Sequence, residues 1–492
     1  RASNMSWKDT AEPVLTRLPA IRRPDGHVPF KRKLGWTAGI LILYFFLTNV
    51  MLFGVGSSSD VFGRFRSILA GSSGSLMQVG IGPIVTASIV LQLLGGSNLL
   101  GLDTQNNPRD QVLYQGLQKF LVIIMTALTA IPMVYAGFLT ADASIANSLG
   151  IPLGGLEFLI FLQVFVGGIL ILYMDEIVSK WGIGSGIGLF IIAGVSQRLI
   201  GGLIATPTFG GQWGIFPTWV RMALGIEERP NPIAPGGFNE LIFGQAELLA
   251  IFTTVAIFAI VVYAESVRVE IPLSNARVKG ARGRFPVKLI YASVLPMILV
   301  RALQMNVQFL GRGLNQVTTP PSWLAVYDGE GRAVDGLFYY LSPIQTPDDW
   351  MWFTGGPPPG DPAVWQILTR VSVDLTVMIL GGAIFAIFWV RTTNMGPEAT
   401  AQQIHNSGMQ IPGFRQNVKS IERVLEQYIP QVTVIGGALV GVLAVGANMF
   451  GTIGGVTGTG LLLTVSITYK LYEQIAEEQL MEMHPMMRRM FS

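Results

Sequence analysis

The residue types that most often carry out chemistry are scarce in this chain of 492 residues. It contains no Cys, and its three His residues, His27, His405 and His484, lie far apart in polar stretches. Disulfides, thiolate metal sites and Cys nucleophiles are therefore excluded, and a multi-His metal site is not expected. The GxxxxGK[ST] loop that binds nucleotide phosphates does not occur in the sequence. We therefore predict no catalytic residue, no cofactor and no metal site, and we do not expect an enzyme.

Two pairs of branched apolar residues are candidates for a different role. Ile81 and Val85 lie four residues apart in GIGPIVT, and so do Ile187 and Ile191 in GSGIGLFI. Each pair therefore occupies one face of a helix, and the glycines beside it allow neighbouring helices to approach closely. A ring of such side chains can close a pore by excluding water. Contact with lipid or with other helices is the common alternative for this spacing.

The composition indicates that these pairs belong to a membrane protein. Half of the residues are hydrophobic and 13% are charged, whereas soluble domains carry about 25% charged residues. A helix needs about 20 mostly apolar residues to cross a bilayer. Ten segments qualify, namely 34–55, 75–95, 119–139, 155–174, 186–204, 247–265, 289–310, 371–390, 430–450 and 454–472. We predict an all-α polytopic membrane protein with ten transmembrane helices.

The predicted spans fall into two halves of five. A cytoplasmic tail (1–33) precedes the N-terminal half (34–204), and an external hinge loop (205–246) leads to the C-terminal half (247–475) and a cytoplasmic tail (476–492). Because each half has an odd number of spans, the second half enters the membrane from the opposite side, as in an inverted repeat. Most of the 33 Lys and Arg residues lie in the tails and in the loops on the same side, so both termini are predicted to be cytoplasmic.

Charged residues are sparse within the predicted spans. Arg198 and Asp374 lie near span ends, and Arg301 lies inside the seventh span. The spans contain no carboxylate ladder of the kind that proton-driven transporters use, which favours a passive conduit over a pump. An ion-coupled secondary transporter of a small solute remains the alternative, because ten spans in inverted halves also suit that class.

The N-terminal tail contains apolar residues that gather near one face of a predicted helix. They lie opposite Lys8 and Arg17, and they are Trp7, Val14, Leu15, Leu18 and Ile21. This pattern predicts a helix that lies on the membrane surface.

A further apolar segment, 57–74 (SSSDVFGRFRSILAGSSG), is too short to cross a membrane. The apolar residues on one helical face of it are Val61, Phe62, Phe65, Ile68 and Leu69. About ten helical residues can form a re-entrant or interfacial helix. An ordinary helix in an outer loop fits the pattern equally well.

The chain resembles the SecY family, the channel subunits of the Sec protein translocon, and within it the archaeal type. The resemblance extends over about residues 31–485. It is carried by GIGPIVTASIVLQLL (80–94), LYMDEIVSKWGIGSGIGLFIIAGVSQ (172–197), VVYAESVRVEIPL (261–273), GRAVDGLFYYLS (331–342) and LLLTVSITYKLYEQ (461–474). It implies a protein-conducting channel in the cytoplasmic (plasma) membrane that translocates secretory polypeptides and releases transmembrane segments sideways into lipid. The implied partners are small single-span subunits of the SecE and β types, the ribosome, and nascent polypeptides with signal sequences.

The resemblance also places the working parts of such a channel. Segment 57–74 is implied to be a plug helix in the outer funnel, and a lateral gate is implied between spans two and three and spans seven and eight. The implied pore ring consists of Ile81, Val85, Ile187, Ile191, Ile298 and Leu463. The implied gate residues are Thr86, Thr129, Asn306 and Gln308. Val294 stands where the family often has Asn, which makes the polar cluster of the gate thinner.

Basic residues gather in two predicted cytoplasmic loops. The first loop has Glu270 as its single acid and contains Arg277, Lys279, Arg282, Arg284 and Lys288. The second contains Arg415, Lys419 and Arg423. Such charge orients a loop toward the cytoplasm. The resemblance implies in addition that both loops bind the ribosome, where clustered Lys and Arg would give salt-sensitive affinity for RNA.

Overall fold

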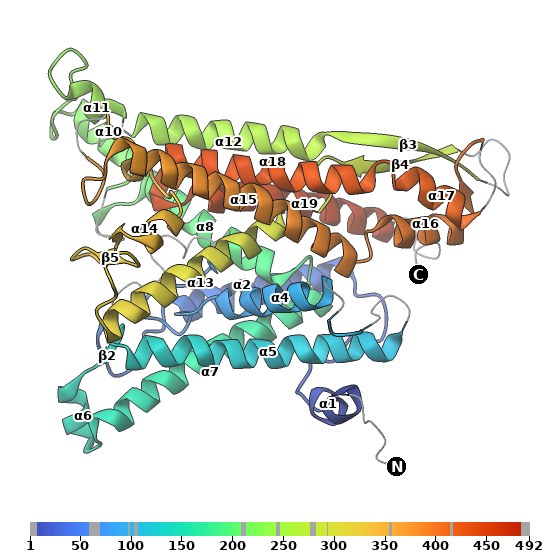
Figure 1. The fold of residues 1–492 in the computed structure, drawn as a ribbon, viewed down its shortest axis with the longest axis horizontal. Helices are drawn as coiled ribbons and strands as arrows, with labels where there is room; N and C mark the ends of the chain where they lie inside the picture. The colour runs from blue at the N-terminus through green and yellow to red at the C-terminus, as the bar shows by residue number, and fades with distance from the viewer. Residues whose placement is uncertain are drawn as a thin grey trace.

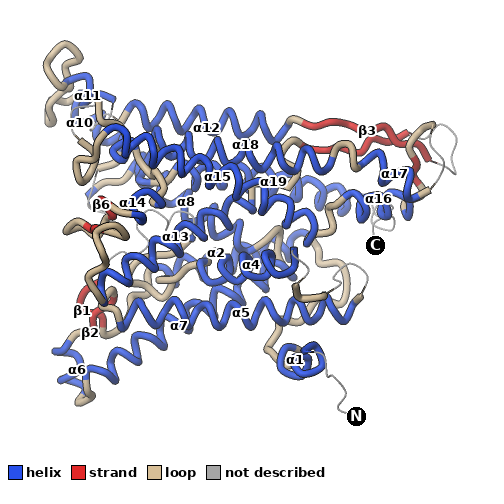
Figure 2. Tube along the Cα trace, in the orientation of Figure 1, coloured by secondary structure: helices blue, strands red, loops and turns tan. Residues whose placement is uncertain are grey.

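The computed structural model describes residues 7–58, 69–96, 99–102, 107–207, 213–242, 247–275, 282–292, 294–353, 357–413 and 417–483. Long helices lie side by side across the molecule (Figures 1 and 2), and one of them falls in each apolar segment predicted to span the membrane. These helices are α2 (Phe30–Thr48), α4 (Gly82–Gly96), α5 (Pro108–Tyr135), α7 (Leu153–Trp181), α8 (Gly186–Ile204), α12 (Leu248–Ser266), α13 (Leu295–Val317), α15 (Val364–Thr392), α18 (Ile429–Phe450) and α19 (Gly458–Met483).

Six helical stretches among the described residues are long and apolar enough to cross a membrane by length and composition. They are α5, α7, α8 and α12 and the stretches that contain α15 and α18. The helix α4 is apolar but shorter, and charged or polar residues interrupt α2, α13 and α19. Large apolar side chains such as Phe252 (72% exposed) and Phe258 (58% exposed) project outward from α12, as expected for a surface that faces lipid.

The helices differ from the predicted spans in their ends, and the first two spans extend beyond their helices into non-helical backbone. The first helix ends at Thr48 and not at residue 55, because Val55 begins the strand β1 (Val55–Ser58), which pairs antiparallel with β2 (Leu139–Ala141). The second helix begins at Gly82 and not at residue 75, since residues 75–81 form turns. Both errors arise because an apolar run has no signal for where its backbone stops being helical.

The shorter elements collect at the two ends of the long helices (Figure 1). One end, here called the loop end, carries β1, β2, α6 (Ala143–Leu149), α10 (Ile215–Ala223), α11 (Gly237–Ile242), β5 (Val326–Tyr327), β6 (Ala333–Asp335), α14 (Leu337–Leu341), and the turns η2 (Pro347–Asp349) and η3 (Ile453–Gly455). The other end, here called the hairpin end, carries β3 (Arg268–Asn275), β4 (Arg282–Lys288), α16 (Pro397–Asn406), β7 (Met409–Gln410) and α17 (Val418–Leu425).

The strands of the hairpin end correct the prediction of an all-α protein. The first basic loop forms an antiparallel pair in a sheet with the order β4-β3-β7. Its apolar residues alternate along the strand, so that Ile271 and Leu273 are buried while Val269 is exposed. Alternation with a period of two is typical of a strand with one buried face. This face packs on Ile421 and Leu425 of α17 in an apolar cluster of its own.

The N-terminal tail packs on α5 and α7. The helix α1 (Trp7–Leu15) ends before two of the predicted apolar positions, and Leu15 is buried against Gly116 of α5. Residues 16–22 then continue as an irregular strap. Glu176 of α7 accepts hydrogen bonds from Lys119 (2.8 Å), Lys180 (2.6 Å) and the Ile21 backbone N–H (3.2 Å). One carboxylate therefore joins the strap to two helices.

We predict that Glu176→Ala releases this strap. The substitution leaves Lys119 and Lys180 without their shared acceptor, and hydrogen bonds to charged groups are worth about 1.5–3 kcal/mol each. Trypsin cleavage after Arg22, measured in detergent, should accelerate about tenfold relative to the parent protein. Glu157→Ala, at the opposite end of α7, is the control and should leave the rate unchanged. Equal rates in the two variants would show that Glu176 does not hold the strap.

Candidate functional site

The six residues predicted to form a ring come together in one apolar cluster. Ile81 directly precedes α4, and the other five lie in the first two turns of their helices: Val85 (α4), Ile187 and Ile191 (α8), Ile298 (α13) and Leu463 (α19). Five of them are at most 2% exposed, and Ile187 is half-buried against the same cluster. The helix α4 packs against α13, and α8 packs against α19. Both contacts join a helix of the N-terminal half to one of the C-terminal half.

Two hollows lie toward opposite ends of the long helices. The larger, about 1350 Å³, opens among Tyr44, Thr206, Thr346 and other residues of the loop end. The smaller, about 550 Å³, opens among Lys33, Lys470 and other residues of the hairpin end. Leu189 and Ile192 of α8 line both hollows, so the hollows approach each other along this helix. The six residues of the apolar cluster are not among the residues that line either hollow.

The predicted gate residues are only partly brought together. Asn306 of α13 donates a hydrogen bond to the Thr86 hydroxyl of α4 at 3.0 Å, which bridges the two halves. Thr129 donates to the Met125 carbonyl within its own helix (2.8 Å). Gln308 donates to the Phe338 carbonyl of α14 at 3.4 Å, on its own half of the chain. Thr86 and Asn306 thus form the polar contact of this seam, as we call the α4–α13 boundary.

Two residues near the seam were missed by sequence reasoning. The ring of Phe138, just after α5, lies 6.1 Å from that of Phe309 in α13, a distance typical of an aromatic pair. Phe309 directly follows the predicted gate residue Gln308, but no local pattern shows which ring it will meet. Within the described part of the chain, α4 and α13 therefore meet through the Asn306–Thr86 hydrogen bond and through apolar contacts.

The end of segment 57–74 is buried beside the apolar cluster. Four predicted plug residues, Val61, Phe62, Phe65 and Ile68, lie outside the described residues. The fifth, Leu69, is 1% exposed, and its carbonyl accepts a hydrogen bond from the Ile81 backbone N–H at 2.7 Å. Gly80 makes this approach possible, because its φ is +56° and a Cβ there would lie 2.2 Å from the Leu69 oxygen. An ordinary helix in an outer loop, the alternative for this segment, would not explain why Leu69 is buried.

A tyrosine fixes the next residue of the segment. The Tyr44 hydroxyl of α2 donates a hydrogen bond to the Ala70 carbonyl at 2.7 Å. The Tyr44 ring stacks on Phe190 of α8, with 5.0 Å between the ring centroids, and is itself 2% exposed. Ala70 has a φ of +53°, a strained conformation for a residue other than Gly. The bond from Tyr44 therefore holds a strained turn in place.

The basic residues of the hairpin end are unequal in accessibility. Arg277, Lys279 and Arg415 lie outside the described residues, and of Arg282 only the backbone is described. Arg284 is 75% exposed and pairs with Glu270 at 2.6 Å. Lys288 is bound to Glu473 of α19 at 2.8 Å, so its ammonium is already engaged within the protein. Lys419 and Arg423 lie one turn apart on the exposed face of α17.

The ionisable residues within the predicted spans differ in their placement. Arg198 lines the larger hollow. Asp374 was predicted near a span end, but α15 begins at Val364, so this carboxylate lies in the helix interior and is buried. It forms an ion pair with Arg301, and neither residue lines a hollow. Among the described residues no group of three or more His, Asp or Glu side chains could hold a metal ion.

Comparison with known proteins gives consistent matches over nearly the whole chain. The SecY family model matches residues 75–472, and the model of the plug domain of Sec61p matches residues 42–74. The protein translocase subunit SecY of Haloarcula marismortui is 70% identical over 491 residues, which are 99% of this chain and 100% of that protein. A solved structure of a protein conducting channel has a TM-score of 0.78 and 40% identity, with 96% of this chain and 98% of that chain covered. Sec61 in the canine ribosome-channel complex from the endoplasmic reticulum has a TM-score of 0.76 and 39% identity, with the same coverage.

We predict that Tyr44→Phe loosens the end of the plug segment. It removes only the hydroxyl that donates to Ala70, and a buried neutral hydrogen bond is worth about 1 kcal/mol, or about a fivefold change in an equilibrium. In the naturally cysteine-free chain, a Leu69→Cys thiol should react about fivefold faster with a water-soluble maleimide when Tyr44 is Phe.

The matched control is Tyr135→Phe in the same Leu69→Cys background. Tyr135 is 52% exposed at the end of α5, so its hydroxyl should not affect the labelling rate. If Tyr44→Phe labels no faster than this control, the hydroxyl of Tyr44 does not hold the segment.

Proposed function

The chain belongs to the SecY family and is a protein-conducting channel for translocation across a membrane, and from this we propose that six clustered apolar residues form the constriction through which polypeptide passes. The observation that carries the proposal is that Ile81, Val85, Ile187, Ile191, Ile298 and Leu463 come from helices of both halves and pack in one apolar cluster. Two hollows approach each other along α8, the helix that carries Ile187 and Ile191. We infer that the cluster, here called the neck, is the barrier between the two ends of the channel.

An apolar neck suits a substrate of variable sequence. Its side chains form no directional bonds that would favour one passing residue over another. When the neck is empty, water withdraws from a narrow apolar passage, and ions without their water are excluded. We infer that segment 57–74 adds a plug on the side of the larger hollow, since Leu69 and Ala70 are fastened to Ile81 and Tyr44 at that side.

We infer that transmembrane segments leave the channel between α4 and α5 on one side and α13 and α15 on the other. Thr86 and Asn306 supply the hydrogen bond across this seam, and one neutral bond contributes about 1 kcal/mol. An arriving apolar helix gains roughly 25 cal/mol for each Å² that it removes from water. Burial of a modest area therefore outweighs the contact that must break.

We infer ten membrane spans in two inverted halves, with both termini on the cytoplasmic side of the plasma membrane. Five long helices precede residues 205–246 and five follow them. The strap at residues 16–22 and the basic hairpin both lie at the hairpin end, and basic residues mark the cytoplasmic side. The hinge is then the external loop, and the halves can part like a clamshell around it.

The partners inferred for this chain follow from its relatives and its charge. Because the Sec61 relative is part of a ribosome-channel complex, we propose that ribosomes dock on the hairpin end through Arg284, Lys419 and Arg423. Small single-span subunits of the SecE and β types, and nascent chains with signal sequences, complete the proposed set. The family match argues against the alternative of a solute transporter.

We predict that a stalled secretory nascent chain crosslinks to photoreactive probes placed at Ile81, Ile187 and Ile298. These side chains should surround an engaged polypeptide if they form the neck. A probe at Leu128, which is 56% exposed on α5, is the control and should react with lipid. Probes at the three neck positions that react only with lipid would refute the constriction.

We predict that replacing Arg284, Lys419 and Arg423 by Glu weakens ribosome binding in a salt-dependent manner. Each lost phosphate contact should reduce the slope of log affinity against log salt by about one. Arg332→Glu is the control, because this residue is half exposed at the opposite, loop end. Binding of the triple variant that matches the control at low salt would exclude this docking surface.

A further inference from the structure

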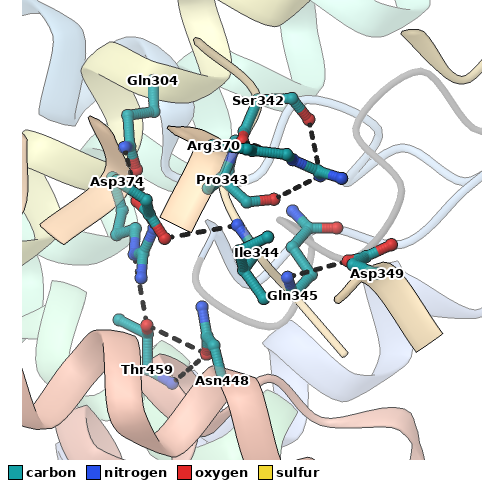
Figure 3. Close-up of polar contacts among 11 residues, drawn as sticks. Gln304, Ser342, Pro343, Ile344, Gln345, Asp349, Arg370, Asp374, Asn448 and Thr459 are labelled. Atoms are coloured by element: carbon teal, nitrogen blue, oxygen red, sulfur yellow. Dashed lines mark hydrogen bonds and ion pairs between the residues drawn. The ribbon is translucent and has the colours of Figure 1, made fainter. Parts of the chain in front are cut away.

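A charged pair lies in the apolar interior of the C-terminal half. The Arg301 guanidinium of α13 and the Asp374 carboxylate of α15 are 3.3 Å apart, and each side chain is 1% exposed. Figure 3 shows Asp374 within a group of polar contacts that joins several elements. Nothing in the constriction or the seam described above uses this pair, although charges are rarely placed inside a membrane protein without a role.

The Asp374 carboxylate accepts hydrogen bonds from three groups. Its Oδ1 accepts hydrogen bonds from Arg301 Nη1 (3.3 Å) and from Gln304 Nε2 (3.1 Å), both on α13. Its Oδ2 accepts from the Ile344 backbone N–H (3.2 Å), in the segment that follows α14. The carboxylate therefore ties α13, α15 and a segment of the loop end to one point.

Arg301 extends the group to two more helices. Its Nη1 donates to Gln304 Oε1 (2.8 Å), and its Nε donates to the Thr459 hydroxyl of α19 (3.2 Å). The backbone N–H of Thr459 and its hydroxyl both donate to Asn448 Oδ1 of α18 (2.8 and 3.2 Å). Four helices thus share one continuous set of bonds, which we call the ionic network: Arg301, Gln304, Asp374, Asn448 and Thr459.

The neighbouring loop is fastened by a second arginine. Arg370 lies one turn before Asp374 on α15 and donates to the Ser342 and Pro343 carbonyls, each at 3.0 Å. Its guanidinium also lies over the Tyr339 ring, 5.1 Å from the centroid. Residues 342–344 are therefore held to α15 at two successive turns, and the network has a fixed support at the loop end.

The network lies next to two residues of the proposed constriction. Ile298 precedes Arg301 by three residues on α13, and Leu463 follows Thr459 by four residues on α19. Residues three or four apart are neighbours on a helix surface. The bond between Arg301 and Thr459 therefore sets the position of Ile298 relative to Leu463.

We propose that the ionic network is a positioning device that keeps α13 fixed to α15 and α19, so that the channel opens along the Thr86–Asn306 seam and not within its C-terminal half. This inference rests on the proposed function, because it assigns a mechanical role to the helices of the neck and the gate. Donor and acceptor atoms that are about 3.6 Å or more apart no longer form a hydrogen bond. A shift of α13 by one residue along its axis, about 1.5 Å, would break several bonds at once.

Stability alone does not account for such a network. Well-packed apolar residues in place of a buried ion pair are often as stable as the pair or more so, whereas removal of one partner leaves an uncompensated charge. The directional bonds add what apolar packing lacks, a single allowed arrangement of the helices. The seam differs, because its described residues share a neutral hydrogen bond, whereas the network has an ion pair with several bonds around it.

The experiment compares helix positions in the parent protein and in the neutral double variant Arg301→Met with Asp374→Leu. Spin labels in the cysteine-free chain report the distance between Leu310 on α13 and Leu368 on α15, both exposed. We expect the distance distribution to broaden about twofold, because the variant packs well but has no directional bonds. The resting ion conductance of reconstituted channels should also rise several-fold. Arg312→Met, on the same helix but outside the network, is the control and should change neither.

A second variant keeps the inference testable if the double variant does not fold. Thr459→Val removes the hydroxyl that bridges Arg301 to α19 but leaves the ion pair intact. Labels at Leu310 and Tyr472 on α19 should then show a broader distribution, while the Leu310–Leu368 distribution stays narrow. Unchanged distributions in both folded variants would overturn the proposal.

These outcomes separate the network from the constriction. The distance between α13 and α15 does not depend on where a polypeptide passes. A broadened distribution together with failed crosslinking at Ile81, Ile187 and Ile298 would refute the constriction and support the network. Normal crosslinking with unchanged distributions would leave the constriction in place and refute the network.

Discussion

A channel for polypeptides must stay sealed when it is empty and must not bind its cargo tightly when it is full. An apolar neck meets both demands, because it excludes water without forming directional bonds. The remaining features of the structure are consistent with this constraint. The two hollows approach each other along α8, and the proposed neck is supplied by helices from both halves of the chain. Parting of the halves therefore widens the neck without the need to break any bond within it.

The polar contacts differ in number and in charge between the seam, the interior of the C-terminal half and the plug segment. Between the halves, at the seam, Asn306 donates one neutral hydrogen bond to Thr86. Within the C-terminal half, Arg301 and Asp374 connect α13 to its neighbours through a charged pair and several further bonds. At the plug segment, Tyr44 holds a single strained turn. In the proposed opening, the contact that breaks at the seam is neutral, whereas the contacts proposed to persist within the C-terminal half include a charged pair.

The fold was predictable where consecutive residues carried the signal. Each apolar segment contains a helix, since backbone groups in lipid must be satisfied within the segment itself. The predictions were wrong where the backbone leaves the helix inside an apolar run, as at Thr48 and before Gly82. The basic hairpin was predicted only as a charged loop. Its buried residues Ile271 and Leu273 alternate with exposed residues, and this period of two is typical of a strand.

The sequence by itself determined the class of the protein, the number of apolar segments and the family, because hydropathy and motifs are properties of neighbouring residues. It also supplied the apolar character of the neck, since each of the six positions is a branched aliphatic residue. Only the tertiary structure decided which partners meet. Arg301 and Asp374 are 73 positions apart, and Thr86 and Asn306 are 220 positions apart. A bond between distant residues depends on how helices pack in three dimensions, and no local pattern along the chain records that packing.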